Sequence, residues 1–298
     1  MSLGLFAGLL TSFAWGIVDV TAALSGHRVG SLRALAGTQV ISVIVLVAYV
    51  ALDSSKVGPD PMAGIVAGLP IGLLGGVAYL GYFTALKLGP LAVVSPVIVA
   101  YGGLTVILAV VLRGETLLPL QAAGAALATV GVMLTGIVFD IRSLRSTRLV
   151  GPGVAIAFVT IVLFSLVTVL MSDPIRAHGW LPVVIGSRLA NATFVLTLLA
   201  IGSRGVAFLR PLMLPSDGWT RVAIVLVLIT GIFDVGGLIA YAIGLEVAPI
   251  WLIGLSSSFG PVFAIGYAVW RLGERLRPAQ WAGLGLLGIG VMVLAVSG

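Results

Sequence analysis

Residues 114–121 read GETLLPLQ and residues 273–280 read GERLRPAQ, so the chain carries one motif twice, 159 positions apart. The same shift aligns residues 82–133 with residues 241–292 without a gap. Shared apolar residues alone would mean little in so hydrophobic a chain. A Gly-Glu pair, a proline and a glutamine at fixed spacing are hard to obtain by chance. The sequence therefore predicts two copies of one structural unit, with any functional site where the copies meet.

The composition identifies the solvent of this chain as a lipid bilayer. Of its 298 residues, 60% are hydrophobic and 9% are charged, and the mean hydropathy is +1.23, whereas soluble domains carry about 25% charged residues. Cysteine is absent and there are two histidines, so neither a metal nor a cofactor is predicted. The formal charge of +6 does not indicate nucleic-acid binding, because the arginines lie at the ends of apolar runs.

Ten apolar runs are long enough to cross a membrane, which takes roughly 20 residues. They cover about residues 3–24, 33–51, 62–86, 91–112, 117–139, 150–171, 181–201, 221–244, 249–270 and 279–297. Turn residues and charges separate them, including a predicted loop from Ser172 to Pro182. Five helices per unit, an odd number, invert the second unit. We expect an all-α membrane protein of ten transmembrane helices, built from two inverted five-helix repeats over residues 1–140 and 150–298.

The positive charges predict an orientation. Twelve of the 16 Lys and Arg residues lie in connections that follow odd-numbered helices, and three lie in those that follow even-numbered helices. Because Lys and Arg favour the cytoplasmic side, both termini are predicted outside the cytoplasm. We expect a multi-pass protein of the cytoplasmic membrane of a prokaryote. One chain with two units is sufficient for a pathway, so a monomer suffices.

Glycines and the repeated glutamates predict packing. Gly64, Gly68, Gly72 and Gly76 recur every four residues in the third helix, which lets another helix approach closely. Glu115 and its equivalent, Glu274, lie in connections, where capping or contact with an arginine is expected.

These motifs resemble the drug/metabolite transporter superfamily, and within it the EamA-type ten-helix carriers. The resemblance rests on the Gly-Glu of each unit, the Gly-rich helix after it and Trp15-Gly16 in the first helix. Arg188 resembles an arginine often found in the second helix of its unit, but Gln39 stands at the matching position of the first unit. The resemblance covers the full length. It implies a secondary carrier, commonly an exporter of amino acids or other small metabolites, with a cavity lined mainly by the third and fourth helices of each unit.

Tyrosines mark one helix face in each unit. Tyr82 and Tyr241 are equivalent under the 159-residue shift, and Gly75 and Tyr79 share the face of Tyr82. A phenol ring combines apolar area with a hydroxyl, which suits a small amphipathic substrate. These tyrosines are predicted to bind substrate, and the alternative is packing between helices.

Two acidic residues are candidates for proton coupling. Asp234, equivalent to Gly75, lies near the middle of the eighth helix, where a carboxylate usually faces a cavity or a partner. It either carries protons or pairs with Arg188. Asp19 lies in the last third of the first helix, where pairing with Arg28 and a coupling role are the two interpretations.

The predicted substrate site includes further residues. Arg188 and Asn191 share a helix face, and the arginine either fixes a substrate carboxylate or neutralises Asp234. A serine in a helix either lines a cavity or bonds back to its own backbone. The remaining candidates are Trp15, Tyr101, Trp251 and Ser258.

No phosphate-binding loop or catalytic set is visible, so the chain is not expected to be an enzyme. The leading prediction is a secondary active transporter of small metabolites that exports amino acids or related compounds by alternating access. The alternatives are a proton-coupled multidrug efflux carrier for cationic compounds, an integral-membrane enzyme and a non-transporting membrane protein. The expected partners are a small-molecule substrate and the lipid bilayer, and nucleic acid is not among them.

Overall fold

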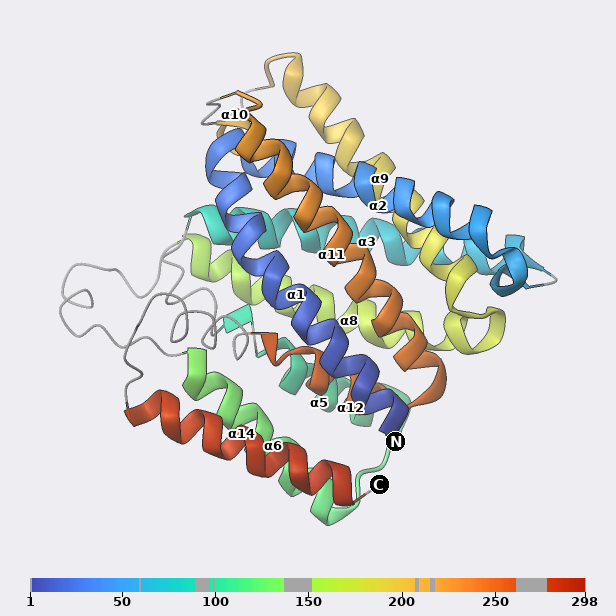
Figure 1. Ribbon diagram of the computed structural model, residues 1–298, viewed down its shortest axis with the longest axis vertical. Helices are drawn as coiled ribbons and strands as arrows, with labels where there is room; N and C mark the ends of the chain where they lie inside the picture. The colour runs from blue at the N-terminus through green and yellow to red at the C-terminus, as the bar shows by residue number, and fades with distance from the viewer. Residues whose placement is uncertain are drawn as a thin grey trace.

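The computed structural model describes residues 2–58, 60–88, 97–98, 100–136, 152–206, 209–214, 218–260 and 278–297, and every regular element in these ranges is a helix. In chain order they are α1 (Ser2–Val29), α2 (Ser31–Leu52), η1 (Ser54–Val57), α3 (Pro61–Leu88), α5 (Tyr101–Arg113), α6 (Pro119–Gly136), α8 (Pro152–His178), α9 (Trp180–Ser203), α10 (Arg210–Met213), α11 (Arg221–Val247), α12 (Ile250–Ser257) and α14 (Pro278–Val296). Figure 1 shows them as one bundle.

The helices suit a bilayer. Within the described residues, α1, α2, α3, α8, α9, α11 and α14 are long and apolar enough to cross a membrane, and α5 and α6 are shorter apolar helices. A helix satisfies its own backbone polar groups, which a bilayer requires. Large apolar side chains such as Val47, Val111 and Met292 are exposed on the outside. The chain is therefore a multi-pass membrane protein. The fourth and ninth predicted helices fall partly on residues 89–96, 99 and 261–277, which lie outside the described residues.

The predicted loop from Ser172 to Pro182 is wrong, because α8 continues to His178 with Pro174 inside it. Met171 and Ile175 are buried in the core on either side of Pro174. Their packing holds the segment helical, and prolines are tolerated in membrane helices when neighbours satisfy the freed backbone groups.

In each unit a glycine at an equivalent position separates the first helix from the second. Gly30 separates α1 from α2 with φ 89° and ψ 145°, and Gly179 separates α8 from α9 with φ 82° and ψ 155°. Positive φ is readily adopted only by glycine. The two glycines lie 149 positions apart, and the same shift relates Gly37 to Gly186 and Gln39 to Arg188. The repeat therefore extends into helices whose side chains have diverged.

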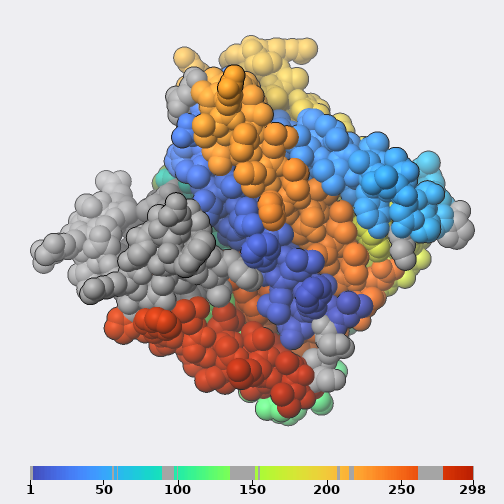
Figure 2. Space-filling model, viewed as in Figure 1, coloured from blue at the N-terminus to red at the C-terminus, as the bar shows by residue number. Residues whose placement is uncertain are grey.

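Helix contacts in the bundle are reciprocal between the units. α1 packs against α11, and its equivalent α8 packs against α3, the equivalent of α11. Likewise α2 contacts α11 while α9 contacts α3. The equivalent helices α6 and α14 contact each other, and so do α5 and α12, which belong to the fourth predicted helices of the two units. Figure 2 shows α1 in blue running along α11 in orange on one face of the molecule. A twofold relation between the units produces such reciprocity.

The glycine stripe of α3 packs against α9, as predicted. A Cβ built on Gly68 would lie 2.3 Å from the Val183 carbonyl oxygen, and one on Gly72 would lie 2.0 Å from that of Ser187. No side chain fits in these spaces. The close approach brings the polar residues of α9 next to the tyrosines of α3.

One end of the bundle collects the connections that follow α1, α3 and α9. Arg33 Nη1 donates to the Met213 carbonyl oxygen at 2.8 Å, and Lys87 Nζ donates to that of Pro211 at 2.5 Å. Arg33 of α2 and Lys87 of α3 thus hold α10 in place at this end of the bundle.

The opposite end is held by Glu115. Its Oε1 accepts from the Ile250 amide at 2.9 Å and its Oε2 accepts from the Trp251 amide at 3.0 Å, which caps α12 of the other unit. Arg176 lies 3.9 Å away and donates to the Ala248 carbonyl oxygen at 2.9 Å. The predicted capping by Glu115 is thus confirmed, whereas Glu274 lies outside the described residues.

Candidate functional site

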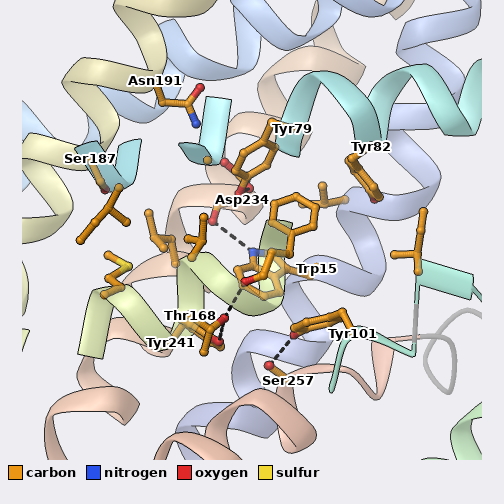
Figure 3. Close-up of a pocket in the computed structure, with 18 of the residues that line it drawn as sticks. Trp15, Tyr79, Tyr82, Tyr101, Thr168, Ser187, Asn191, Asp234, Tyr241 and Ser257 are labelled. Atoms are coloured by element: carbon orange, nitrogen blue, oxygen red, sulfur yellow. Dashed lines mark hydrogen bonds between the residues drawn. The ribbon is translucent and has the colours of Figure 1, made fainter. Parts of the chain in front are cut away.

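A cavity of about 130 Å³ lies where the two units meet (Figure 3). It is lined by Trp15, Val18, Asp19, Ile71, Gly72, Gly75, Tyr79, Tyr82, Ile98, Tyr101, Phe164, Val167, Thr168, Met171, Ser187, Arg188, Asn191, Asp234, Leu238, Tyr241, Ser257, Ser258 and Gly260. The third and fourth helices of each unit supply most of these residues, as the resemblance implies. α1, α8 and α9 also contribute, because α1 and α8 each pack against the third helix of the other unit.

A buried ion pair lies at the wall of the cavity. Arg188 Nη2 on α9 is 2.8 Å from Asp234 Oδ2 on α11, and the two side chains are 2% and 1% exposed. A buried carboxylate or guanidinium is tolerated when a partner compensates its charge. Of the two interpretations of Asp234, the structure shows the pairing, and Arg188 neutralises it.

Two further residues bind the terminal nitrogens of Arg188, whereas its Nε has no hydrogen-bond partner among the described residues. Its Nη1 donates to Gln39 Oε1 at 3.1 Å and its Nη2 donates to the Tyr79 hydroxyl at 3.3 Å. Tyr79 in turn donates to Asp234 Oδ1 at 2.7 Å, and its ring centroid lies 5.2 Å from the guanidinium carbon. Gln39 and Arg188 are equivalent positions of the two units and face each other. The guanidinium is thus engaged by protein groups on several sides.

Asp19 lies in the cavity and its carboxylate accepts a hydrogen bond from the Tyr82 hydroxyl. Of the two interpretations of Asp19, pairing with Arg28 is not what the structure shows. Arg28 lies nine residues further along α1, about 13 Å at the rise of a helix, and so is too far along the axis for a salt bridge. No cation pairs with Asp19 among the described residues.

The second unit repeats this arrangement with a neutral group. Tyr241 and Thr168 share a hydrogen bond of 2.6 Å between their hydroxyls, and the Trp15 ring lies 5.3 Å from that of Tyr241. Correspondingly, the Phe164 ring lies 6.1 Å from that of Tyr82. The 149-residue shift relates Asp19 to Thr168 and Trp15 to Phe164. The cavity therefore has two related ends, one acidic and one neutral.

Sequence reasoning did not select Thr168 or Phe164 as site residues. The signal that could have found them is the 149-residue shift, which the glycine pairs of α2 and α9 already suggest. Ser257 was also missed. Its hydroxyl lies 2.5 Å from that of Tyr101, and the contact joins α5 to α12 (Figure 3).

Two predicted polar residues, Ser258 and Asn191, line the cavity, and neither has a side-chain hydrogen bond to the other repeat among the described contacts. The Ser258 hydroxyl donates to the Leu255 carbonyl oxygen of its own helix at 2.7 Å, so cavity contact and back-bonding both occur. Asn191 is 3% exposed, and its Oδ1 has no hydrogen-bond partner among the described residues. An unpartnered buried amide is costly unless a ligand or water satisfies it.

Trp251 is the predicted site residue that the structure places elsewhere. Its side chain is 2% exposed within the hydrophobic core and does not line the cavity. Trp251 lies in the first turn of α12, beneath the Glu115 cap, whereas Ser257 and Ser258 at the far end of that helix reach the cavity.

The side chains that line the cavity are suited to binding a small molecule. Six aromatic side chains line it: Trp15, Tyr79, Tyr82, Tyr101, Phe164 and Tyr241. Among the described residues no group of three or more His, Cys, Asp or Glu is placed to hold a metal ion. Aromatic walls with a few polar groups are typical of small-molecule sites.

Comparison with known proteins agrees with this architecture. A solved structure described only as "Crystal structure of protein" superposes with a TM-score of 0.73 over 99% of this chain and 96% of that chain, at 23% sequence identity, which shows a shared fold. A search of curated proteins gives no significant match. The family model described as "EamA-like transporter family" matches twice, over residues 2–137 and 151–296. The chain therefore belongs to the EamA-like transporter family.

Proposed function

We propose that the protein is a secondary active transporter that exports amino acids or related small compounds. The observation that carries this proposal is the cavity, which is enclosed by equivalent helices of two units and lined by aromatic and polar side chains. A site between repeats near the middle of a bundle is typical of transporters that work by alternating access.

The proposed transport cycle uses the reciprocity of the two units. We infer ten transmembrane helices in two inverted repeats, residues 1–140 and 150–298, that exchange their packing when the cavity opens to the other side. The reciprocal contacts of α1 with α11 and of α8 with α3 support this inference. A single chain contains both units, so a monomer is sufficient.

The proposed orientation places the end that holds Arg33 and Lys87 in the cytoplasm of a prokaryotic cell and both termini outside. The excess of Lys and Arg in the connections of that end supports it. A reporter fused after the last residue should be active only outside the cytoplasm. A cytoplasmic signal would contradict the orientation and leave the fold untouched.

Proton-coupled efflux of cationic compounds is the second candidate. The observation in its favour is that the cavity contains Asp19, a carboxylate whose only described partner is a tyrosine hydroxyl. Acidic residues within membrane helices commonly mark ion or substrate pathways.

Flux from proteoliposomes tests the proposal. Purified protein is reconstituted, the vesicles are loaded with labelled amino acids and amines, and release is measured with and without a proton gradient. We expect saturable release of at least one amino acid or related compound over empty liposomes. Folded protein that moves no solute under any gradient would exclude the transporter assignment for these classes.

A further inference from the structure

The charges of the described residues that line the cavity do not balance. Arg188 and Asp234 neutralise each other at 2.8 Å, and Arg188 is the only Lys or Arg among the described lining residues. Asp19 remains, with a hydrogen bond from Tyr82 and no cation beside it among the described residues. The described cavity therefore has an excess of one carboxylate. A ligand that brings one positive charge would complete it, since a carboxylate held away from water requires compensation.

Aromatic rings surround this carboxylate. Tyr82, its hydrogen-bond partner, contacts the ring of Phe164 edge-on at 6.1 Å, and Phe164 contacts Tyr79 in the same way at 5.3 Å. Tyr101 also lines the cavity. The faces of such rings attract ammonium groups, and the attraction is stronger where water is excluded. A carboxylate beside several ring systems is a site for an organic cation.

The same cavity is poorly suited to a second anion. A ligand carboxylate would enter a space that already has excess negative charge among the described residues. Both terminal nitrogens of Arg188 are engaged by Asp234, Gln39 and Tyr79, which leaves only its buried Nε without a partner. The Asn191 amide, whose oxygen has no partner among the described residues, is a neutral group. An amino acid therefore has a favourable partner for its ammonium group and an unfavourable environment for its carboxylate.

The size of the cavity limits the cation. At about 130 Å³, it is close to the volume of an engineered cavity that holds benzene, about 150 Å³. This favours a small primary amine over a bulky drug cation.

We propose that Asp19 and Tyr82 form the ammonium subsite of the transported molecule, and that the protein prefers small cationic amines to the corresponding zwitterionic amino acids. The proposal rests on the proposed transport function and specifies the substrate class of the same cavity. Asymmetry between the units supports it, because Thr168 is the neutral counterpart of Asp19 and leaves a single anionic end.

Binding to the purified full chain by titration calorimetry in detergent tests the preference. The probes are isoamylamine, leucine, which adds a carboxylate to the same skeleton, and isocaproate, which has the carboxylate without the amine. We expect isoamylamine to bind most tightly and isocaproate most weakly. Native protein that binds leucine as tightly as isoamylamine, or more tightly, would overturn the proposal without recourse to any variant.

Three variants locate the subsite. Asp19→Asn should weaken isoamylamine about 10-fold or more, the usual effect of losing a charged hydrogen bond, and should erase the preference over isocaproate. Tyr82→Phe keeps the charge but loses the hydrogen bond to the carboxylate, so it should keep the order of the three probes while weakening isoamylamine less than Asp19→Asn does. Asp60→Asn removes an exposed carboxylate at the start of α3, which accepts only from the Ala63 amide at 3.3 Å in the described contacts, and should behave like the native protein.

The outcomes separate this proposal from the function on which it rests. If leucine binds and is transported, and Asp19→Asn leaves the preference unchanged, the ammonium subsite is refuted and transport stands. If neither amines nor amino acids bind to or move through folded native protein, the proposed function itself fails. If Asp19→Asn does not fold, the order of the three probes on native protein and on Tyr82→Phe still decides.

Discussion

Removing one member of the Arg188–Asp234 pair should destabilise the protein far more than removing a charge from its surface. The pair is 2.8 Å apart with both side chains almost fully buried. Opposite charges about 4 Å apart attract by about 4 kcal/mol at an effective dielectric constant of 20. Breaking a buried pair typically costs about 3 to 5 kcal/mol, because the remaining charge lacks a partner.

The contacts also predict which single change is worse. In Arg188→Met, Asp234 retains one donor, the Tyr79 hydroxyl, and a full uncompensated charge. In Asp234→Asn, Arg188 retains Gln39 and Tyr79, and the new amide oxygen can still accept. We expect Arg188→Met to lose about 4 kcal/mol and Asp234→Asn somewhat less. The double variant should be no less stable than Arg188→Met alone.

Unfolding of the purified protein in mixed micelles, followed by tryptophan fluorescence, measures all three variants. The matched control is Asp173→Asn, which breaks the exposed pair between Asp173 and Arg113 and should cost at most about 1 kcal/mol. Additive losses in the double variant, or an effect of Arg188→Met no larger than that of the control, would refute the idea that the two buried charges compensate each other.

Other changes have separate expectations. Glu115→Ala removes the cap of α12 and should cost about 2 kcal/mol in the same unfolding assay, whereas Glu246→Ala, an exposed glutamate, should cost little. Gly72→Ala places a Cβ 2.0 Å from a backbone oxygen of α9 and should reduce the yield of folded protein, whereas Gly285→Ala, with open space around it, should not. Tyr241→Ala should weaken ligand binding more than folding, as judged by calorimetry beside thermal melting.

The sequence located the faces of the cavity because the repeat is strong there. Tyr82 and Tyr241 are identical residues at a constant shift, and helical spacing places Tyr79 and Asp234 beside them. Both expectations depend on periodicity along single helices. Periodicity alone therefore predicted that these residues line the cavity, before any contact between helices was known.

Contacts that depend on how helices pack could not be predicted in this way. Pairing with Arg28, on the same helix, was one of the two interpretations of Asp19, but Tyr82 approaches it from α3. The side chains of the first two helices have diverged, so the shift that relates Asp19 to Thr168 is visible mainly in glycines. The loop at Ser172 was wrong because turn propensity is a local property, and burial around Pro174 outweighs it.

Trp251 illustrates a different limit. A tryptophan in a membrane helix is suited equally to a ligand and to the core, and its role depends on where the helix begins. Glu115 fixes that beginning through a contact between the two units. Because α12 starts there, Trp251 packs into the core, whereas the serines at the end of the helix reach the cavity.

The central claim, transport through this cavity, is tested most directly by Gly75→Leu in proteoliposomes. Gly75 lines the cavity, and a Cβ there would lie 3.9 Å from its nearest neighbour, the Asn191 amide nitrogen, so a leucine side chain would begin in the cavity without a clash at its Cβ. We predict saturable release of leucine or isoamylamine by native protein, and loss of that release in Gly75→Leu with unchanged thermal stability. Equal release by folded native and Gly75→Leu protein would contradict the account.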